Sequence, residues 1–148
     1  MSDLSDLYQE VILDHYRRPR NSRVLEDADQ SAEGYNPLCG DRLTVYVKLR
    51  EERVEDVTFQ GSGCAISQAS ASVMTEALKG KSRAEIRELF DRFQHLVTGE
   101  GEPDLEALGE MAAMSGVQEF PARVKCATLA WHALLAALDQ DAKRVSTE

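Results

Sequence analysis

The chain has 148 residues, of which 43% are hydrophobic, and its 17 basic and 26 acidic residues give a formal net charge of −9. Length and composition predict one globular domain over residues 1–148, with a frayed tail from about residue 142. The negative charge argues against a nucleic-acid partner, which usually needs a net basic face. An acidic N-terminus and the absence of any apolar run near about 20 residues argue against a signal peptide and a membrane span. We therefore expect a cytoplasmic protein with reduced thiols.

The first predicted element is an amphipathic helix that stops at Pro19. Its apolar positions recur at helical spacing: Leu4, Leu7, Tyr8, Val11, Ile12 and Tyr16. Arginines cluster at its end and form either a docking surface or a solubilising patch: Arg17, Arg18, Arg20 and Arg23. Residues 20–35 are expected to be irregular, apart from one short strand before Gly34.

Two runs of alternating polarity follow and predict an antiparallel hairpin. The apolar face of the first run consists of Leu43, Val45, Val47 and Leu49, and that of the second consists of Val54, Val57 and Phe59. The charged segment Glu51–Arg53 between them fits the turn.

The rest of the chain has the pattern of helices separated by glycine and proline. A helix rich in small residues is expected over about 64–78, and another begins at Ser82, where Glu85 completes a capping box. A short helical stretch over 105–114 and a last helix over about 121–139 follow. Strands that precede helices in this way indicate an α+β fold, a small antiparallel sheet covered by helices.

Thiols and one carboxylate are the chemically distinctive residues. The chain's only cysteines are Cys39, Cys64 and Cys126, and Asp41 lies two residues after the first. An odd number of cysteines is a poor disulfide framework, whereas three thiolates and a carboxylate would complete a four-coordinate site for zinc or a related thiophilic metal. Cys64 and Cys126 lie near predicted helix starts, which favour thiolates. The thiols meet at one pole of the domain if these ends converge.

Plainer interpretations of the same residues stay open at this point. Any one cysteine can be a core filler, Cys64 above all because its neighbours are small, and Asp41 can be a turn-forming residue. Arg123, three residues before Cys126, is a candidate for offsetting the negative charge of the ligands, or is a solvated helix charge. Histidines are expected to be surface or partly packed side chains rather than ligands: His15, His95 and His132.

Four segments carry a resemblance to a known family: Leu7–Asn21, Asn36–Asp41, Gly61–Ser72 and Phe120–Trp131. They resemble the IscU/SufU iron–sulfur cluster assembly proteins, in the same order and over most of the chain. The chain is more similar to SufU than to IscU, because Lys125 stands where IscU-type proteins place a histidine.

The resemblance implies an α+β fold of the SufE/IscU type with a three-stranded antiparallel sheet. It also implies zinc at Cys39, Asp41, Cys64 and Cys126 and a pyridoxal-phosphate cysteine desulfurase as partner. Cys39 would then accept sulfur from the desulfurase's persulfide, and Arg123 would support the charge of the site. A downstream scaffold or an apoprotein would receive the sulfur.

Two competing functions are open. In the first, the chain is a non-enzymatic scaffold, on which Cys39, Cys64 and Cys126 bind a transient [2Fe–2S] cluster that passes to apoproteins. In the second, it is a structural zinc domain that binds another protein, and Cys39 is unreactive. The preferred prediction is a zinc-dependent sulfurtransferase of iron–sulfur cluster assembly.

Overall fold

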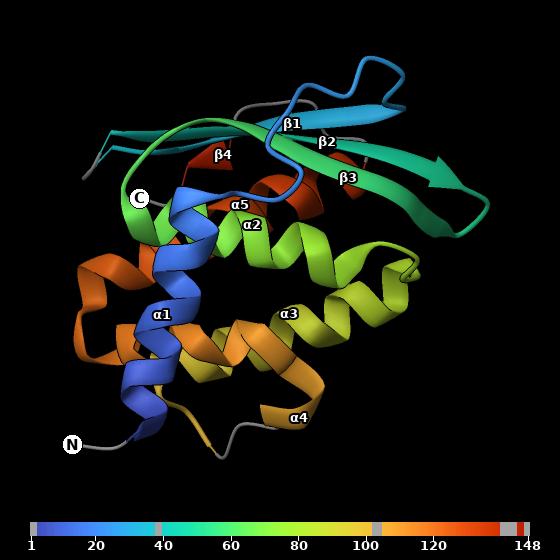
Figure 1. The fold of residues 1–148 in the computed structure, drawn as a ribbon. Helices are drawn as coiled ribbons and strands as arrows, with labels where there is room; N and C mark the ends of the chain where they lie inside the picture. The colour runs from blue at the N-terminus through green and yellow to red at the C-terminus, as the bar shows by residue number, and fades with distance from the viewer. Residues whose placement is uncertain (1–2, 38–39, 102–104, 140–144, 147–148) are drawn as a thin grey trace.

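A small β-sheet forms one layer of the molecule, and helices cover one of its faces (Figure 1). The computed structural model describes residues 3–37, 40–101, 105–139 and 145–146. The strands are β1 (Gln30–Asn36), β2 (Asp41–Arg50), β3 (Arg53–Ser62) and β4 (Val145–Ser146). The helices are α1 (Asp3–Arg17), α2 (Ala65–Leu78), α3 (Arg83–Thr98), α4 (Leu105–Leu108), the 3₁₀ helix η1 (Gly109–Glu119) and α5 (Pro121–Leu138). None of the helices within these ranges is long and apolar enough to span a membrane.

The sheet has the order β3-β2-β1-β4. Strands β1, β2 and β3 pair antiparallel, which confirms the predicted three-stranded antiparallel sheet. The two-residue β4 adds a parallel edge, with Val145 opposite Gly34. It lies within the part of the tail for which the sequence predicts fraying.

Alternation places the apolar residues of β2 and β3 on the covered face. Leu43, Val45 and Val47 are fully buried, and Val45 lies opposite Phe59 of β3. Leu49 is only half-buried, because the register of β2 and β3 shifts between Lys48 and Leu49. The predicted hairpin is confirmed, and its inward residues form the sheet's side of the core.

Strand β1 continues past the point at which the sequence predicts it to end. Gly34 lies in its middle, facing α5, and a Cβ there would be 3.0 Å from Leu129 Cδ1 and 3.3 Å from the Leu129 carbonyl oxygen. The glycine therefore allows α5 to approach the sheet closely, instead of ending the strand.

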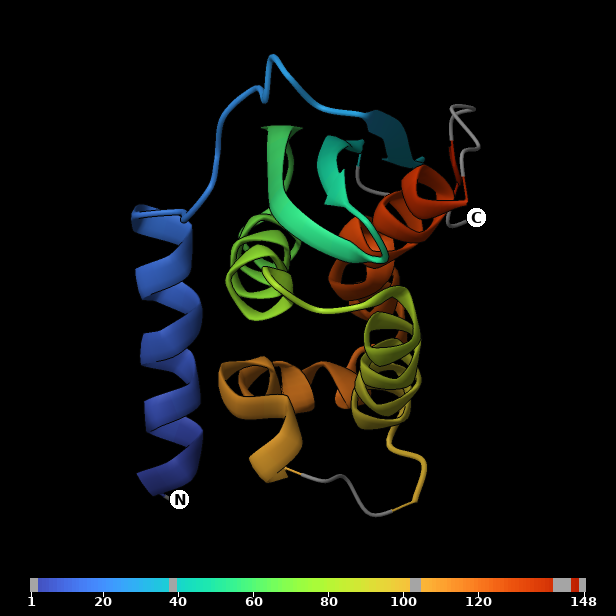
Figure 2. The same cartoon turned by 90° about the vertical axis from the view of Figure 1, so that its right-hand side faces the viewer.

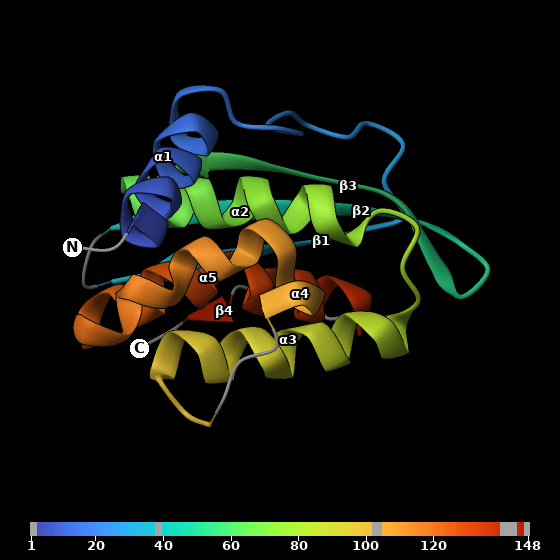
Figure 3. The same cartoon turned by 60° about the horizontal axis from the view of Figure 1, so that its bottom comes forward.

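Helices α2 and α5 lie directly against the sheet, and α3 and η1 lie beyond them (Figure 3). The small side chains predicted for α2 bring it close to α5, since the Ser70 hydroxyl donates to the Ala127 carbonyl at 2.6 Å. Helix α3 begins with the predicted capping box, formed by Ser82 and Glu85. Trp131 of α5 is fully buried and stacks on Phe93 of α3, with ring centroids 5.3 Å apart.

The prediction of a helical stretch over 105–114 is only partly correct. One turn of α-helix, α4, is followed by the 3₁₀ helix η1, which continues to Glu119. The physical reason is Gly109, whose φ of +56° is incompatible with a continuous α-helix.

Helix α1 packs on the flank of the helical layer, beside α2 and η1 (Figure 2). A polar contact fixes its end: His15 Nδ1 lies 2.7 Å from Ser72 Oγ, and His15 Nε2 lies 3.2 Å from Glu110 Oε2. His15 is buried, so its expected place at the surface or in a partly packed position is wrong. The histidine is satisfied by partners from α2 and η1, which are distant in sequence.

Candidate metal centre

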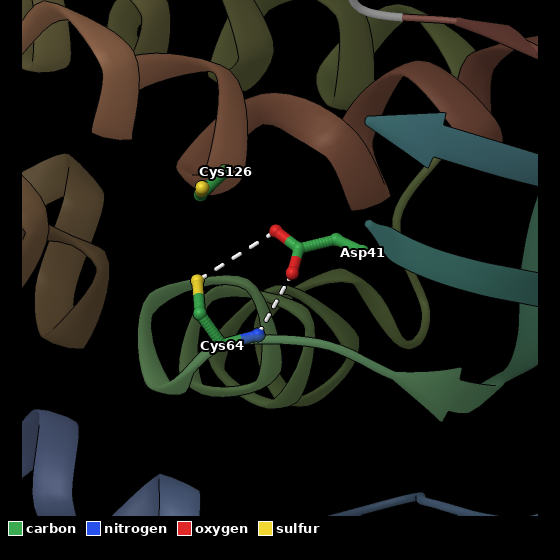
Figure 4. A group of neighbouring side chains, drawn as sticks. All are labelled: Asp41, Cys64 and Cys126. Atoms are coloured by element: carbon green, nitrogen blue, oxygen red, sulfur yellow. Dashed lines mark hydrogen bonds between the residues drawn. The ribbon is translucent and has the colours of Figure 1, made fainter. Parts of the chain in front are cut away.

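Three potential ligands from three elements converge at one pole of the fold (Figure 4). Asp41 is the first residue of β2, Cys64 is the N-cap of α2, and Cys126 lies in the second turn of α5. One ligand atom from each lies within 4.8 Å of the other two. Among the described residues this is the one group of three or more such side chains, and no histidine belongs to it.

Asp41 is buried and bonds directly to the start of α2. Its Oδ1 accepts the Cys64 backbone N–H at 2.8 Å, and its Oδ2 accepts the Cys64 thiol at 3.6 Å. Cys64 itself makes no capping hydrogen bond with its side chain, so the carboxylate from β2 serves the helix N-terminus instead. The positive end of the helix dipole favours both a carboxylate and a thiolate at this place. Asp41 therefore bonds to a residue 23 positions away in sequence rather than only within its own turn, and its role as a metal ligand stays a prediction.

The two described thiols differ in accessibility. Cys126 is fully buried, whereas Cys64 is half-exposed at the beginning of its helix. The alternative in which Cys64 fills the core therefore does not hold. Cys39, the third predicted thiol ligand, lies outside the described residues.

Asn36 is a member of this site that the sequence analysis did not single out. Its side chain is fully buried, and its Nδ2 donates to Cys126 Sγ at 3.6 Å. The available signal was the alternation of β1, which places Ala32, Gly34 and Asn36 on the covered face. A polar side chain at the end of such a face needs a buried partner.

Gly63 creates the space for the carboxylate. A Cβ at this position would lie 2.8 Å from Asp41 Oδ1 and 2.5 Å from Ser67 Oγ. Both distances are shorter than real Cβ contacts allow, so a side chain at residue 63 would require the Ser67 hydroxyl and the Asp41 carboxylate to shift.

Gly63→Ala is expected to displace the Asp41 carboxylate and, if the group binds zinc, to weaken that binding about 10- to 100-fold, the usual effect of changing a residue that supports a metal ligand. Competition with a chromophoric chelator measures this affinity. Gly116→Ala is the matched control, because a Cβ at Gly116 meets nothing within 4 Å. Equal zinc affinities for the two variants would contradict the role of Gly63.

The arginines singled out in the sequence take different places. Arg123 is exposed in the first turn of α5, one turn before Cys126, and its predicted support of the site's charge stays a prediction. In the arginine cluster, Arg20 pairs with Asp14 at 2.7 Å and Arg23 pairs with Asp56 at 3.0 Å. Two of the four arginines therefore have intramolecular partners.

The donor set and its spacing suit a thiophilic ion. Zinc binds sulfur at about 2.3 Å, which places two tetrahedral thiolates about 3.8 Å apart. A thiolate and a carboxylate oxygen on the same ion would be about 3.5 Å apart. The Cys64 Sγ–Asp41 Oδ2 distance is 3.6 Å, and the whole group spans at most 4.8 Å. The three side chains therefore need only a small contraction to bind one ion. Their two sulfurs favour zinc over magnesium or calcium.

Comparisons with known proteins agree on one family. The model of the NifU-like N-terminal domain matches residues 7–127. SufU of Bacillus subtilis, named a zinc-dependent sulfurtransferase, is 46% identical over 133 residues, which are 90% of this chain and 90% of the relative. IscU of Streptococcus pyogenes, named an iron–sulfur cluster assembly scaffold protein, is 43% identical over 96% of this chain and 89% of its own. The crystal structure of the N-terminal part of a NifU-like protein from Brucella abortus superimposes with a TM-score of 0.84 at 27% identity, covering 95% of this chain and 97% of that one.

Proposed function

Because the chain belongs to the family of NifU-like N-terminal domains, with relatives named IscU and SufU, we propose that it works in iron–sulfur cluster assembly and accepts persulfide sulfur from a pyridoxal-phosphate cysteine desulfurase. The observation that carries the proposal is the convergence of Asp41, Cys64 and Cys126 within 4.8 Å. The name of the Bacillus relative supports zinc and sulfur transfer as the chemistry of this group.

The ligands of zinc would be Asp41, Cys64, Cys126 and Cys39. Bound zinc would keep the thiols deprotonated at neutral pH. Carboxylate is a harder ligand than thiolate, so this set is more exchangeable than one of four cysteines. Arg123, at the start of α5, would offset part of the charge, since four anionic ligands exceed the two positive charges of zinc.

Cys39 is the proposed sulfur acceptor. Its thiolate attacks the outer sulfur of the persulfide on the desulfurase cysteine. A new S–S bond forms between Cys39 Sγ and that outer sulfur, the old S–S bond breaks, and the desulfurase cysteine leaves as a thiolate. Burial argues against the same reaction at Cys126, which has no exposed surface. Cys64 is held by Asp41 through both its backbone N–H and its thiol.

A scaffold function is the second candidate, favoured by the name of the Streptococcus relative. The chain would then hold a [2Fe–2S] cluster on Cys39, Cys64 and Cys126 and pass it to apoproteins. Anaerobic reconstitution with iron and sulfide separates the two functions. A stable visible chromophore that transfers to an apo-ferredoxin favours the scaffold, and zinc retention without a chromophore favours sulfur relay.

Cys39→Ala is expected to reduce the desulfurase's turnover of cysteine to the level seen without this chain, because the acceptor sulfur is missing. The measurement is alanine formation by the desulfurase with a fixed excess of the zinc-loaded variant. Ser115→Ala, which changes a side chain of η1, is the control and should keep wild-type stimulation. Full stimulation by Cys39→Ala would refute Cys39 as acceptor.

A further inference from the structure

We propose that Asn36 is a positioning residue of the metal centre, which holds the Cys126 sulfur in its ligating position through an N–H···S hydrogen bond. The inference rests on the proposed function in one respect: Cys126 is taken to be a ligand that stays on the metal. The sequence pattern of β1 indicates that Asn36 is buried but not which residue it contacts, and its contact with Cys126 joins residues 90 positions apart.

The direction of the hydrogen bond follows from chemistry. Asn36 Nδ2 carries only donor hydrogens, so at 3.6 Å from Cys126 Sγ it donates to the sulfur. Both side chains are fully buried, so bulk solvent does not compete with this donor. A thiolate accepts such a bond more strongly than a thiol does, because the bond is then assisted by charge.

The backbone fixes Asn36 independently of the sulfur. In the β1–β2 pairing Asn36 lies opposite Asp41, and the Asn36 carbonyl accepts the Gly40 N–H at 2.8 Å. The same end of the hairpin therefore presents the Asp41 carboxylate to Cys64 and the Asn36 amide to Cys126. Two paired residues at this end of the sheet thus each contact one of the two described thiols.

The hydrogen bond from Asn36 would keep the Cys126 sulfur on the metal, in contrast to a ligand that leaves the metal during the reaction. A hydrogen bond to a ligating sulfur withdraws electron density from it and restricts its rotation. Cys126 is thereby made a less reactive nucleophile and a fixed ligand. The carboxamide of Asn36 would lose free energy if it were buried here without a partner, so simple space filling does not account for it.

The test uses Asn36→Leu, which keeps a similar branched shape but has no donor, in the full chain loaded with zinc or cobalt(II). We expect zinc affinity to fall about 10- to 100-fold, as for other changes of residues that support metal ligands. We also expect the sulfur-to-cobalt charge-transfer band to move to longer wavelength, because the sulfur becomes more electron-rich. Asn36→Ala, which removes the donor without adding bulk, should shift the band in the same direction and serves if the leucine variant does not fold.

Ser70→Ala is the matched control, because it removes a buried hydrogen bond to Ala127, the residue after Cys126, without touching the sulfur. It should lower thermal stability and leave the cobalt band in place. An unshifted band and unchanged zinc affinity in both Asn36 variants would overturn the inference. Cobalt binding without a thiolate band in wild type would overturn both the metal centre and this inference, whereas a wild-type chain that binds metal through thiolates but accepts no sulfur would refute only the proposed function.

Discussion

Cys126→Ser is expected to abolish tight zinc binding. One zinc ion takes about four ligands, so the loss of Cys126 would leave the site incomplete. A serine hydroxyl does not replace it, because it is neither a soft ligand nor ionised at neutral pH. Because Cys126 is fully buried and serine has nearly the same shape, the metal-free fold should form in the variant. The measurement is zinc content after buffer exchange, together with the melting temperature with and without chelator.

A ligand that binds only the folded state stabilises it, so chelation should lower the melting temperature of wild type. In Cys126→Ser, chelation should change nothing, because there is no bound zinc to remove. Ser70→Ala again serves as the control and should keep its zinc. A Cys126→Ser chain that retains tightly bound zinc would contradict the ligand assignment.

Gly61→Ala is expected to have the largest effect on folding. Gly61 of β3 has φ of +149°, and a Cβ there would lie 2.0 Å from the Arg42 carbonyl oxygen and 2.9 Å from Leu43 Cα. Those atoms belong to the backbone of β2 and cannot rotate away. Overpacking and backbone strain each cost roughly 1–3 kcal/mol, so we expect the free energy of unfolding to fall by about 3 kcal/mol or more. Urea denaturation of the metal-free chain measures it.

Substitutions of Gly61 and Gly63 are expected to affect different properties, although the two glycines are only two residues apart. Alanine at Gly61 should lower stability, and alanine at Gly63 should weaken metal binding. Alanine at Gly63 meets the side chains of Asp41 and Ser67, so it disturbs the site more than the fold. Gly116→Ala should leave both properties unchanged. If Gly61→Ala were as stable as Gly116→Ala, the close approach of β3 to β2 would be in doubt.

Local patterns predicted the elements whose residues interact with near neighbours in the sequence. The alternation of β2 and β3 and the capping box of Ser82 and Glu85 are both of this kind, and both are confirmed. Prediction failed where partners come from elsewhere in the chain. His15 is buried by Ser72 and Glu110, and no helical periodicity reveals such partners.

The candidate site, too, contains residues that the sequence predicted and one that it did not. Cysteines at helix starts and the spacing of Asp41 from Cys39 led to the expectation of convergence, and the structure places Asp41, Cys64 and Cys126 together. The alternation of β1 places Asn36 on the covered face, but it does not reveal the partner, since the hydrogen bond to Cys126 depends on the packing of α5 against the end of β1. The roles of Cys39 and Arg123 stay predictions.

The position of the sulfur after one turnover tests directly whether Cys39 is the sulfur acceptor. The zinc-loaded chain is incubated with a cysteine desulfurase and cysteine, and its peptides are analysed by mass spectrometry without reduction. We expect one added sulfur on the peptide that contains Cys39 and none on those that contain Cys64 or Cys126. Added sulfur on either of the latter two peptides, or on none of the three, would contradict this expectation.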